Sequence, residues 1–431
     1  MTASTILYVI IGIVVINYLL DQWLEYLNLQ NKQSKLPESL KGIYDPEEYQ
    51  RSLEYQRTLS KFSFLTSAFG IVVILTVLLT GVFGALDRWL QPQIQNPILL
   101  SLAFFGILGI ASDWLNLPLQ LYRTFVIEER FGFNKTTYRT FFIDKLKGYA
   151  LTLIIGGLVL SGLLYLLMRL GPNYWVYFLI VIAVLMLMIN LFYTSWIVPL
   201  FNKLNPLPDG ELKSAIESYS KKIQFPIKNI FVIDGSKRSN KANAFFSGLG
   251  KRRKIVLYDT LIEKHTTEEL VAVLAHEVGH YKRQHILKGY ALSILQSALM
   301  LFIMSRVIFN VEMSIAMGAE ALNAQNHFGL HLNLLAFGLL YSPISKIISV
   351  LTNLYSRRNE FEADAYATKT YSGNALQAAL KKLSVDNLSN LLPHRWYVFF
   401  HYSHPPLLQR LEAIDREIVS PSTIHSESQS P

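Results

Sequence analysis

Long apolar stretches are the feature that most constrains the fold of this chain of 431 residues. A helix needs about 20 consecutive apolar residues to cross the ~30 Å hydrocarbon core of a bilayer. Seven stretches approach or exceed this length, and they run over Thr5–Leu20, Phe62–Leu86, Pro97–Leu117, Tyr149–Met168, Tyr174–Leu200, Gly289–Phe309 and Gly329–Leu351. The sequence therefore predicts a multi-pass membrane protein.

The composition agrees with this prediction and excludes several classes of protein. Hydrophobic residues make up 51% of the chain and charged residues only 16%, whereas an ordinary globular domain has about 25% charged residues. An aromatic content of 13% argues against a disordered chain. The chain has no cysteine, which excludes disulfides, thiolate metal sites and iron–sulfur clusters. Any metal must therefore be bound by His, Asp or Glu.

Basic residues are distributed unevenly among the predicted loops. The first and third loops are rich in Lys and Arg, whereas the second and fourth each contain a single basic residue, Arg88 and Arg169 respectively. The positive-inside rule then predicts that the N-terminus lies outside and that the C-terminus is cytoplasmic. The formal net charge of +9 fits cytoplasmic loops beside anionic lipid, so no nucleic-acid partner is expected.

The segment His276-Glu277-Val278-Gly279-His280 is the motif that predicts chemistry. Thr266 and Glu269 have the spacing of a capping box, which predicts a helix that starts there and continues through the motif. Histidines at i and i+4 lie on one helix face and can bind the same metal ion. Glu277 lies beside them, where it could accept a proton from a water molecule that zinc makes acidic. Chance would produce this pattern in roughly one such chain in a hundred, so coincidence is the weaker interpretation.

A catalytic zinc usually has three protein ligands and one open position. The segment Arg357–Ala365, which follows the last apolar stretch, is helical by its pattern, and Glu360 and Asp364 share a face at i and i+4. Glu362 points elsewhere. Glu360 could complete the ligand set, and Asp364 could orient a ligand histidine from outside it. The alternative is a solvated, charged helix face.

Residues 1–207 are predicted to form an N-terminal membrane domain with five transmembrane helices. Residues 208–418 are predicted to form a zinc metallopeptidase domain that includes the sixth and seventh, and residues 419–431 a disordered tail. Within the second part, Asn229–Asp234 and Lys254–Tyr258 are predicted strands. Four polar residues within the apolar stretches are expected to line an interior cavity: Asp113, Asn190, Asn333 and Lys346.

Five motifs occur in order along the chain: Glu128–Thr137 (EERFGFNKTT), Phe201–Pro208 (FNKLNPLP), His276–His280 (HEVGH), Asn359–Asp364 (NEFEAD) and His401–Pro406 (HYSHPP). With its seven apolar stretches, the chain resembles the type I CAAX prenyl endopeptidases, a family of integral-membrane zinc metalloproteases, over nearly its whole length. The resemblance implies a mainly α fold, in which a barrel of seven transmembrane helices encloses a chamber and a small α+β zinc metalloprotease domain lies on the cytoplasmic side.

The resemblance also implies roles for individual residues. One zinc ion per chain would be held by His276, His280 and Glu360, with Glu277 as the base. Asp364 would contribute to catalysis next to a ligand histidine, and His404 could stabilise the oxyanion. Two residues would bind substrate: Arg410 near the metal, and Asn243 beside an edge strand that pairs with the substrate backbone. The alternatives are a polar helix surface for His404 and Arg410, and a structural turn for Asn243.

Enzymes of that family remove the C-terminal tripeptide of prenylated CAAX proteins, which implies a peptide or protein substrate and a lipid bilayer as partners. Nothing in the sequence itself indicates recognition of a prenyl group. The absence of cysteine and of a dilysine retrieval signal favours a bacterial inner membrane, with the endoplasmic reticulum as the alternative. Two rival functions stay open. One is an HtpX-like quality-control metalloprotease of membrane proteins. The other is a channel or transporter, for which a broken zinc site is expected, whereas the three candidate ligands and the base are intact in this sequence.

Overall fold

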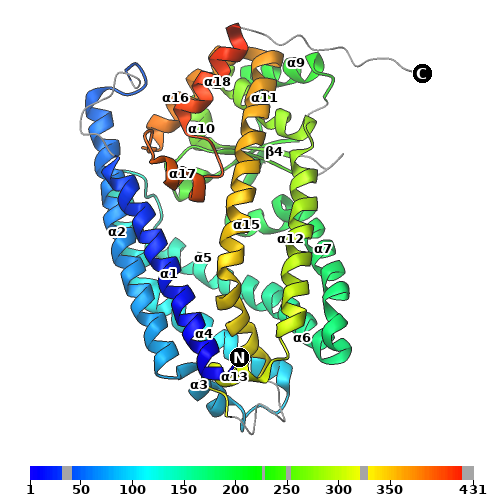
Figure 1. Ribbon diagram of the computed structural model, residues 1–431. Coiled ribbons are helices and arrows are strands. Elements are labelled where there is room, and N and C mark those ends of the chain that lie inside the picture. Colours follow the sequence, from blue (N-terminus) through cyan, green and yellow to red (C-terminus); the bar gives the residue numbers. More distant parts are fainter. Residues whose placement is uncertain (32–40, 226–228, 249–253, 321–328, 420–431) are drawn as a thin grey trace. The chain divides into compact units, whose positions relative to one another are not determined.

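The computed structural model describes residues 1–31, 41–225, 229–248, 254–320 and 329–419 (Figure 1). The first part of the chain forms helices α1 (Ala3–Gln30), α2 (Pro46–Leu79), α3 (Val82–Leu90), α4 (Pro97–Tyr122), α5 (Tyr138–Leu151), α6 (Gly157–Leu170), α7 (Tyr174–Phe192) and α8 (Val198–Phe201). The second part forms α9 (Glu211–Lys222), α10 (Asp259–Lys264), α11 (Thr267–Lys282), α12 (His285–Val307), α13 (Val311–Ala316), α15 (Leu330–Ala367), α16 (Gly373–Asp386), α17 (Arg395–His401) and α18 (Leu407–Val419). The described residues also form four short strands: β1 (Leu204–Pro206), β2 (Ile230–Ile233), β3 (Ala244–Ser247) and β4 (Lys254–Tyr258).

The chain forms two compact units that alternate along the sequence. Unit 1 consists of Met1–Leu29, Arg57–Ile189 and Tyr290–Ser349, and unit 2 consists of Gln30–Gln56, Asn190–Gly289 and Val350–Pro431. Helices α1, α2, α7, α12 and α15 therefore contribute residues to both units. The predicted division into residues 1–207 and 208–418 stays a prediction. Helix α18 extends to Val419, and the remainder of the predicted tail lies outside the described residues.

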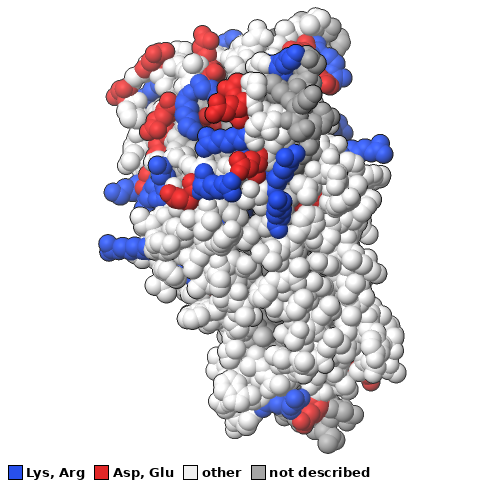
Figure 2. All heavy atoms as spheres, turned by 90° about the vertical axis from the view of Figure 1, so that its left-hand side faces the viewer, with Lys and Arg blue, Asp and Glu red and all other residues white. Residues whose placement is uncertain are grey.

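Apolar helices that need lipid around them make up most of unit 1. Within the described ranges, six helical runs are long and apolar enough to cross a membrane, and only 6–17% of the most apolar window of each is buried in the protein. So much exposed apolar surface is stable in hydrocarbon and not in water. On the face drawn in Figure 2, a wide area shows few Lys, Arg, Asp or Glu side chains.

The number of apolar runs differs from the seven that the sequence predicts, and the difference has a local cause. The run Tyr138–Phe201, 64 residues long, contains both predicted segments Tyr149–Met168 and Tyr174–Leu200. Gly171, with φ 53°, and the 3-10 turn that it begins separate α6 from α7 within this run. The predicted segment Phe62–Leu86 is too long, because α2 ends at Leu79 and Gly81, with φ 69°, precedes the separate helix α3. Only glycine adopts these positive φ values without strain.

Several charged and amide side chains in unit 1 have polar partners, which lowers the cost of placing them where water is scarce. Lys145 donates to both carboxylate oxygens of Asp113 at 2.7 Å, and Lys346 donates to Asp21 at 2.7 Å. Asn333 is fully buried, and its amide donates to the carbonyl oxygens of Ile308 (2.7 Å) and Asn310 (3.2 Å) just after α12. The expectation that Asn333 lines a cavity is therefore wrong, because its amide satisfies backbone acceptors at a helix end.

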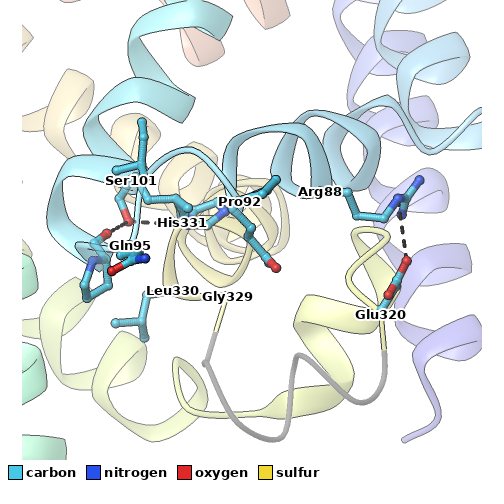
Figure 3. Close-up of a pocket in the computed structure, with 12 residues that line it drawn as sticks. Arg88, Pro92, Gln95, Ser101, Glu320, Gly329, Leu330 and His331 are labelled. Carbon is cyan, nitrogen blue, oxygen red and sulfur yellow. Dashed lines mark hydrogen bonds and ion pairs between the residues drawn. The ribbon is translucent and has the colours of Figure 1, made fainter.

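A pocket of about 780 Å³ in unit 1 lies beside the start of α4 and the start of α15 (Figure 3). Its lining includes Arg88, Ser101 and His331. The imidazole of His331 lies 2.9 Å from an Asp87 carboxylate oxygen and 3.4 Å from the Ser101 hydroxyl, and all three side chains are buried. None of the HExxH residues lines this pocket.

Unit 2 contains a four-stranded sheet in the order β1-β2-β4-β3. The two central strands, β2 and β4, are parallel, and β1 and β3 pair with them in antiparallel fashion. The two segments predicted as strands are therefore confirmed as β2 and β4. Helix α11 packs against α9 and α16, and α16 packs against α18. Buried side chains from these elements form one hydrophobic core, which fixes α11 in place.

We expect the contact between two glycines in unit 1 to be sensitive to a single methyl group. A Cβ atom added to Gly84 would lie 2.0 Å from the carbonyl oxygen of Gly318. Because this neighbour is backbone, Gly84→Ala should destabilise the protein by about 1–3 kcal/mol. The measurement is the melting temperature of the purified protein in detergent. Gly106→Ala is the matched control, because an added Cβ there meets nothing within 4 Å. Equal melting temperatures for Gly84→Ala and the unmodified protein would contradict the expectation.

Candidate metal centre

Helix α11 begins with the predicted capping box. The Thr266 hydroxyl accepts from the backbone N–H of Glu269 at 3.2 Å, and the Glu269 carboxylate accepts from the backbone N–H of Thr266 at 2.9 Å. Both interactions satisfy helical N–H groups that would otherwise have no partner. The apolar residues that follow pack into the core of unit 2, so the orientation of the helix is fixed before the chain reaches His276.

Gly279 allows α11 to come unusually close to α15. A Cβ atom added there would lie 3.0 Å from the Cα atom of Ala363 and 3.1 Å from both the Ala363 carbonyl oxygen and the Cβ atom of Tyr366. Gly279 and Ala363 are both buried. The small residues at this crossing bring Glu360, which lies one turn before Ala363 on α15, within reach of the α11 histidines.

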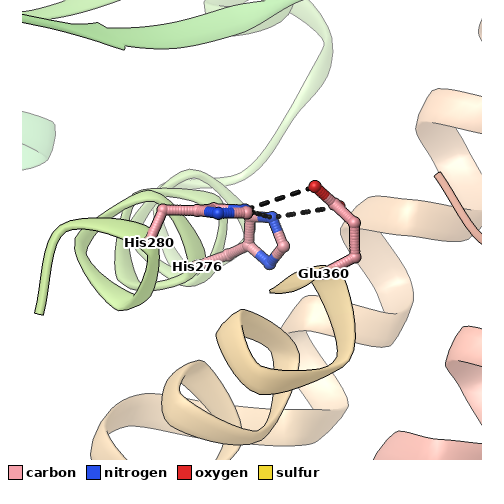
Figure 4. A group of neighbouring side chains, drawn as sticks. All are labelled: His276, His280 and Glu360. Carbon is pink, nitrogen blue, oxygen red and sulfur yellow. Dashed lines mark hydrogen bonds and ion pairs between the residues drawn. The ribbon is translucent and has the colours of Figure 1, made fainter. Parts of the chain in front are cut away.

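His276, His280 and Glu360 meet in one cluster (Figure 4). The Nε2 atoms of the two histidines lie 3.1 Å apart. One Glu360 carboxylate oxygen lies 3.5 Å from Nε2 of His276, and the other lies 3.3 Å from Nε2 of His280. One candidate ligand atom from each residue lies within 4.8 Å of the other two. Two imidazoles and a carboxylate are a donor set that fits zinc and similar divalent metals, so the cluster could hold a metal ion.

Asp364 contacts the outer nitrogen of His276. Its carboxylate lies 2.8 Å from His276 Nδ1 and accepts hydrogen bonds from Arg410 Nε at 2.8 Å and Arg410 Nη2 at 2.6 Å. Arg410 Nη1 also lies 3.6 Å from Glu360. Burial alone would lower the pKa of His276, but its hydrogen bonds with Asp364 and Glu360 outweigh burial and raise the pKa to about 9.

Glu277 lies between the two histidines in sequence, on the helix that carries them. Burial raises the pKa of its carboxyl group above the ordinary value, and the nearby negative charge of Glu360 acts in the same direction. The positive charges that His276 and His280 can carry oppose this increase without cancelling it. A carboxylate whose pKa is raised toward neutrality is better suited to accept a proton and release it again.

His404 and Asn243 are two further residues with predicted roles, and the structure places each of them. The His404 side chain is 66% exposed, and its Nε2 atom lies 3.4 Å from a Glu360 carboxylate oxygen. Asn243 directly precedes β3, the strand at one edge of the sheet, and its backbone carbonyl accepts from the N–H of Tyr258. The structure therefore brings His404 and Arg410 to the metal cluster and places Asn243 at the sheet edge. The roles of all three in catalysis or substrate binding stay predictions.

The sequence analysis missed a second set of residues around the cluster. His280 Nδ1 lies 3.1 Å from His285 Nδ1, and His285 Nε2 lies 3.2 Å from a carboxylate oxygen of Glu362. Arg358 donates to the other Glu362 oxygen at 3.1 Å. Glu362 does point away from Glu360, as expected, but toward His285. The sequence feature that could have revealed this set is a third histidine, His285, five residues after the last histidine of the HExxH motif.

The fold and this cluster together define the class of protein. Apolar helices able to cross a membrane, a capped HExxH helix and a glutamate donor on a second helix are the parts of an integral-membrane metalloendopeptidase. The chain is an enzyme of this class, which acts on a peptide or protein substrate.

Comparisons with known proteins identify the family. Residues 25–203 match the family described as CAAX prenyl protease N-terminal, five membrane helices, and residues 206–418 match peptidase family M48. The chain is 34% identical to a CAAX prenyl protease 1 homolog of Arabidopsis thaliana, covering 95% of this chain and 97% of the relative. Its identity to CAAX prenyl protease 1 of Saccharomyces cerevisiae is 32%, covering 94% of each chain. The chain therefore belongs to the CAAX prenyl protease 1 family of M48 peptidases.

A solved structure supports the same assignment. The crystal structure of S. mikatae Ste24p matches with a TM-score of 0.90 and 31% sequence identity, covering 95% of this chain and 99% of that chain. This similarity confirms the predicted fold class, a mainly helical membrane barrel with a small α+β metalloprotease part. The HtpX-like alternative is not favoured, because relatives that match most of the chain are named CAAX prenyl protease 1 or its homolog.

We expect enlargement of Gly279 to separate Glu360 from the histidines. Gly279→Leu should reduce metal affinity by about tenfold or more, the range typical of changes just outside a metal's ligands. The measurement is the apparent Kd for zinc by chelator competition with purified protein. Gly289→Leu in α12 is the control, because an added Cβ there meets nothing within 4 Å. An unchanged Kd for Gly279→Leu would show that the close helix crossing is not required.

Metal binding should release a proton from His276. With a pKa raised to about 9, the metal-free imidazole is protonated at pH 7, and it must lose its Nε2 proton to become a ligand. The apparent affinity should therefore fall about tenfold for each pH unit below 9. Calorimetry at pH 7 in buffers of different ionisation enthalpy should detect about one released proton per metal ion. Release of no proton at pH 7 would contradict this expectation.

Proposed function

We propose that this protein is a zinc-dependent endopeptidase that removes the C-terminal tripeptide from prenylated CAAX proteins. The observation that carries the proposal is the cluster of His276, His280 and Glu360 beside Glu277, in a chain that is similar over 95% of its length to a CAAX prenyl protease 1 homolog. A channel or transporter would have no need of this donor set. The relatives' names supply the substrate class, and the cluster supplies the reaction type.

One zinc ion would be held by His276 and His280 through Nε2 and by the Glu360 carboxylate. Their donor atoms already lie within 4.8 Å of one another, and nitrogen and oxygen donors suit zinc. When bound, zinc supplies Lewis acidity that polarises a peptide carbonyl and makes water acidic enough to lose a proton near neutral pH.

The chain's own residues would orient the reactants and move protons. Glu277 accepts the proton of the attacking water and then donates it to the leaving amine, a role that its raised pKa favours. Asp364, held by Arg410, fixes the orientation of His276. His404, exposed beside Glu360, is placed to donate a hydrogen bond to the oxyanion.

Substrate binding is proposed at the edge of the sheet. Strand β3 pairs with β4 on one side only in the described sheet, so its free edge can accept an extended peptide as an added strand. Asn243, which directly precedes this strand and is exposed, would contact the peptide backbone. Arg410 keeps Nη1 near Glu360 while its other nitrogens bind Asp364, so any contact with substrate would use that atom.

We further propose that the N-terminus lies outside and the C-terminus in the cytoplasm. Seven crossings are obtained if the run Tyr138–Phe201 crosses twice, with its reversal at Gly171–Asn173. The basic first and third loops are then cytoplasmic, as is the peptidase part within residues 208–418. The relatives described above are eukaryotic, so the preference for a bacterial inner membrane over the endoplasmic reticulum remains a sequence-based proposal only.

Replacement of the base tests the function directly. Glu277→Gln should retain about one zinc per chain and lose turnover of a farnesylated CAAX peptide by roughly 10²–10⁴-fold, because the amide cannot accept the proton. Zinc content and peptide cleavage are measured on the same preparation, with an unprenylated peptide in parallel. Glu268→Gln, an exposed glutamate in the first turn of α11, is the control and should keep full activity.

The outcomes separate the parts of the proposal. Equal cleavage of the two peptides by the unmodified protein would remove prenyl recognition and leave the endopeptidase. Full activity in Glu277→Gln would remove the proposed base. Failure of the unmodified protein to bind zinc would remove the proposed metal.

A further inference from the structure

The two histidines of the cluster receive different support at their outer nitrogens. Nδ1 of His276 faces the Asp364 carboxylate directly, at 2.8 Å. Nδ1 of His280 faces a second imidazole, that of His285, at 3.1 Å, and only beyond it lies a carboxylate, Glu362. The proposed function, on which this inference rests, assigns no role to His285 or Glu362.

Only one arrangement of protons satisfies this chain of contacts when His280 Nε2 binds a metal. A ligand imidazole is neutral and carries its proton on the other nitrogen, so His280 Nδ1 donates and His285 Nδ1 accepts. The proton of His285 must then be on Nε2, where it can be donated to the Glu362 carboxylate at 3.2 Å. Arg358 binds the second oxygen of that carboxylate. With the metal on His280 Nε2, each ring nitrogen of His280 and His285 then has a partner of the correct kind.

The backbone explains how His285 reaches His280. Helix α11 ends at Lys282, and Gln284 adopts the left-handed conformation with φ 58°. This residue redirects the chain so that His285, the first residue of α12, lies against the end of α11. The His285 side chain is 5% exposed, so water cannot readily replace it as the acceptor. Glu362 follows Glu360 by two residues, so α15 provides both a candidate ligand and a supporting carboxylate on different faces.

We infer that His285 and Glu362 are positioning residues of the metal site, which hold His280 in the tautomer and orientation that place Nε2 on the zinc. Arg358 restrains Glu362 in turn. Supporting groups of this kind typically change metal affinity by about 10–100-fold when they are removed. A purely structural role at the junction of α11 and α12 predicts instead a loss of thermal stability that does not depend on hydrogen-bonding capacity.

The test is the apparent Kd for zinc, measured by chelator competition on the purified full-length protein in detergent. His285→Leu removes the acceptor, and Kd should rise by about 10–100-fold. His285→Gln restores an acceptor and a donor of similar reach, and Kd should return to within a few-fold of the unmodified value. Glu362→Ala added to His285→Leu should cause little further increase, because the two residues act through one chain of hydrogen bonds.

His265→Leu is the matched control. His265 is also a buried histidine of unit 2, and its Nδ1 atom contacts only the carbonyl of Leu261 among the described partners of the ring. Its replacement should leave the Kd for zinc unchanged. The melting temperature of each metal-free variant is recorded alongside, which separates loss of folding from loss of metal affinity.

Two results would overturn the inference while the proposed function stands. One is a Kd for His285→Leu equal to that of the unmodified protein. The other is an equal weakening in His285→Leu and His285→Gln together with equally lowered melting temperatures of the metal-free variants. If the unmodified protein itself binds no zinc, the proposed function fails and this inference fails with it.

Discussion

The close crossing of α11 and α15 is the constraint on which the rest of the metal centre depends. The histidines come from one helix and the glutamate from the other, and His280 and Glu360 are 80 residues apart in the sequence. Gly279 and Ala363 remove the side-chain volume that would hold the helices apart. Buried residues of α11 pack into the core of unit 2 and fix the position of the helix. The candidate donor atoms of His276, His280 and Glu360 therefore already lie close together. The small residues at this helix crossing thereby allow the candidate ligands to meet.

Charge balance is the second requirement of the site. Glu360 and Asp364 are buried, and an unpaired buried carboxylate is costly. Arg410 neutralises Asp364 with two hydrogen bonds and lies near Glu360, while Arg358 pairs with the more exposed Glu362. Both arginines donate their hydrogen bonds to carboxylates outside the candidate ligand set, Asp364 and Glu362. Arg410 also pairs with the candidate ligand Glu360 at 3.6 Å, so it balances the buried negative charge on both sides of His276.

Sequence patterns predicted those features that depend on local periodicity. The capped HExxH helix and the shared face of Glu360 and Asp364 follow from residue spacing, and both are confirmed. The apolar segments are confirmed as apolar helices, except that Phe62–Leu86 is too long. The separation at Gly81 was missed, because a single positive-φ residue interrupts an otherwise continuous apolar run, whereas the break at Gly171 falls between two segments that the sequence already separates. The contact between His285 and Glu362 could not be predicted, because it depends on the direction of α12 after Gln284 and on the rotation of α15, which tertiary packing decides.

The alternation of the two units along the chain has a consequence for how the catalytic part can be studied. Unit 2 is assembled from three separate stretches of sequence, and α15 passes from the apolar segment of unit 1 to Glu360 as one helix of 38 residues. No single cut can therefore release a water-soluble catalytic fragment. A fragment that begins after the fifth apolar segment would carry the apolar surfaces of α12 and α15 without the helices that pack against them in unit 1. Trimming the chain therefore cannot separate the candidate metal centre from the apolar segments.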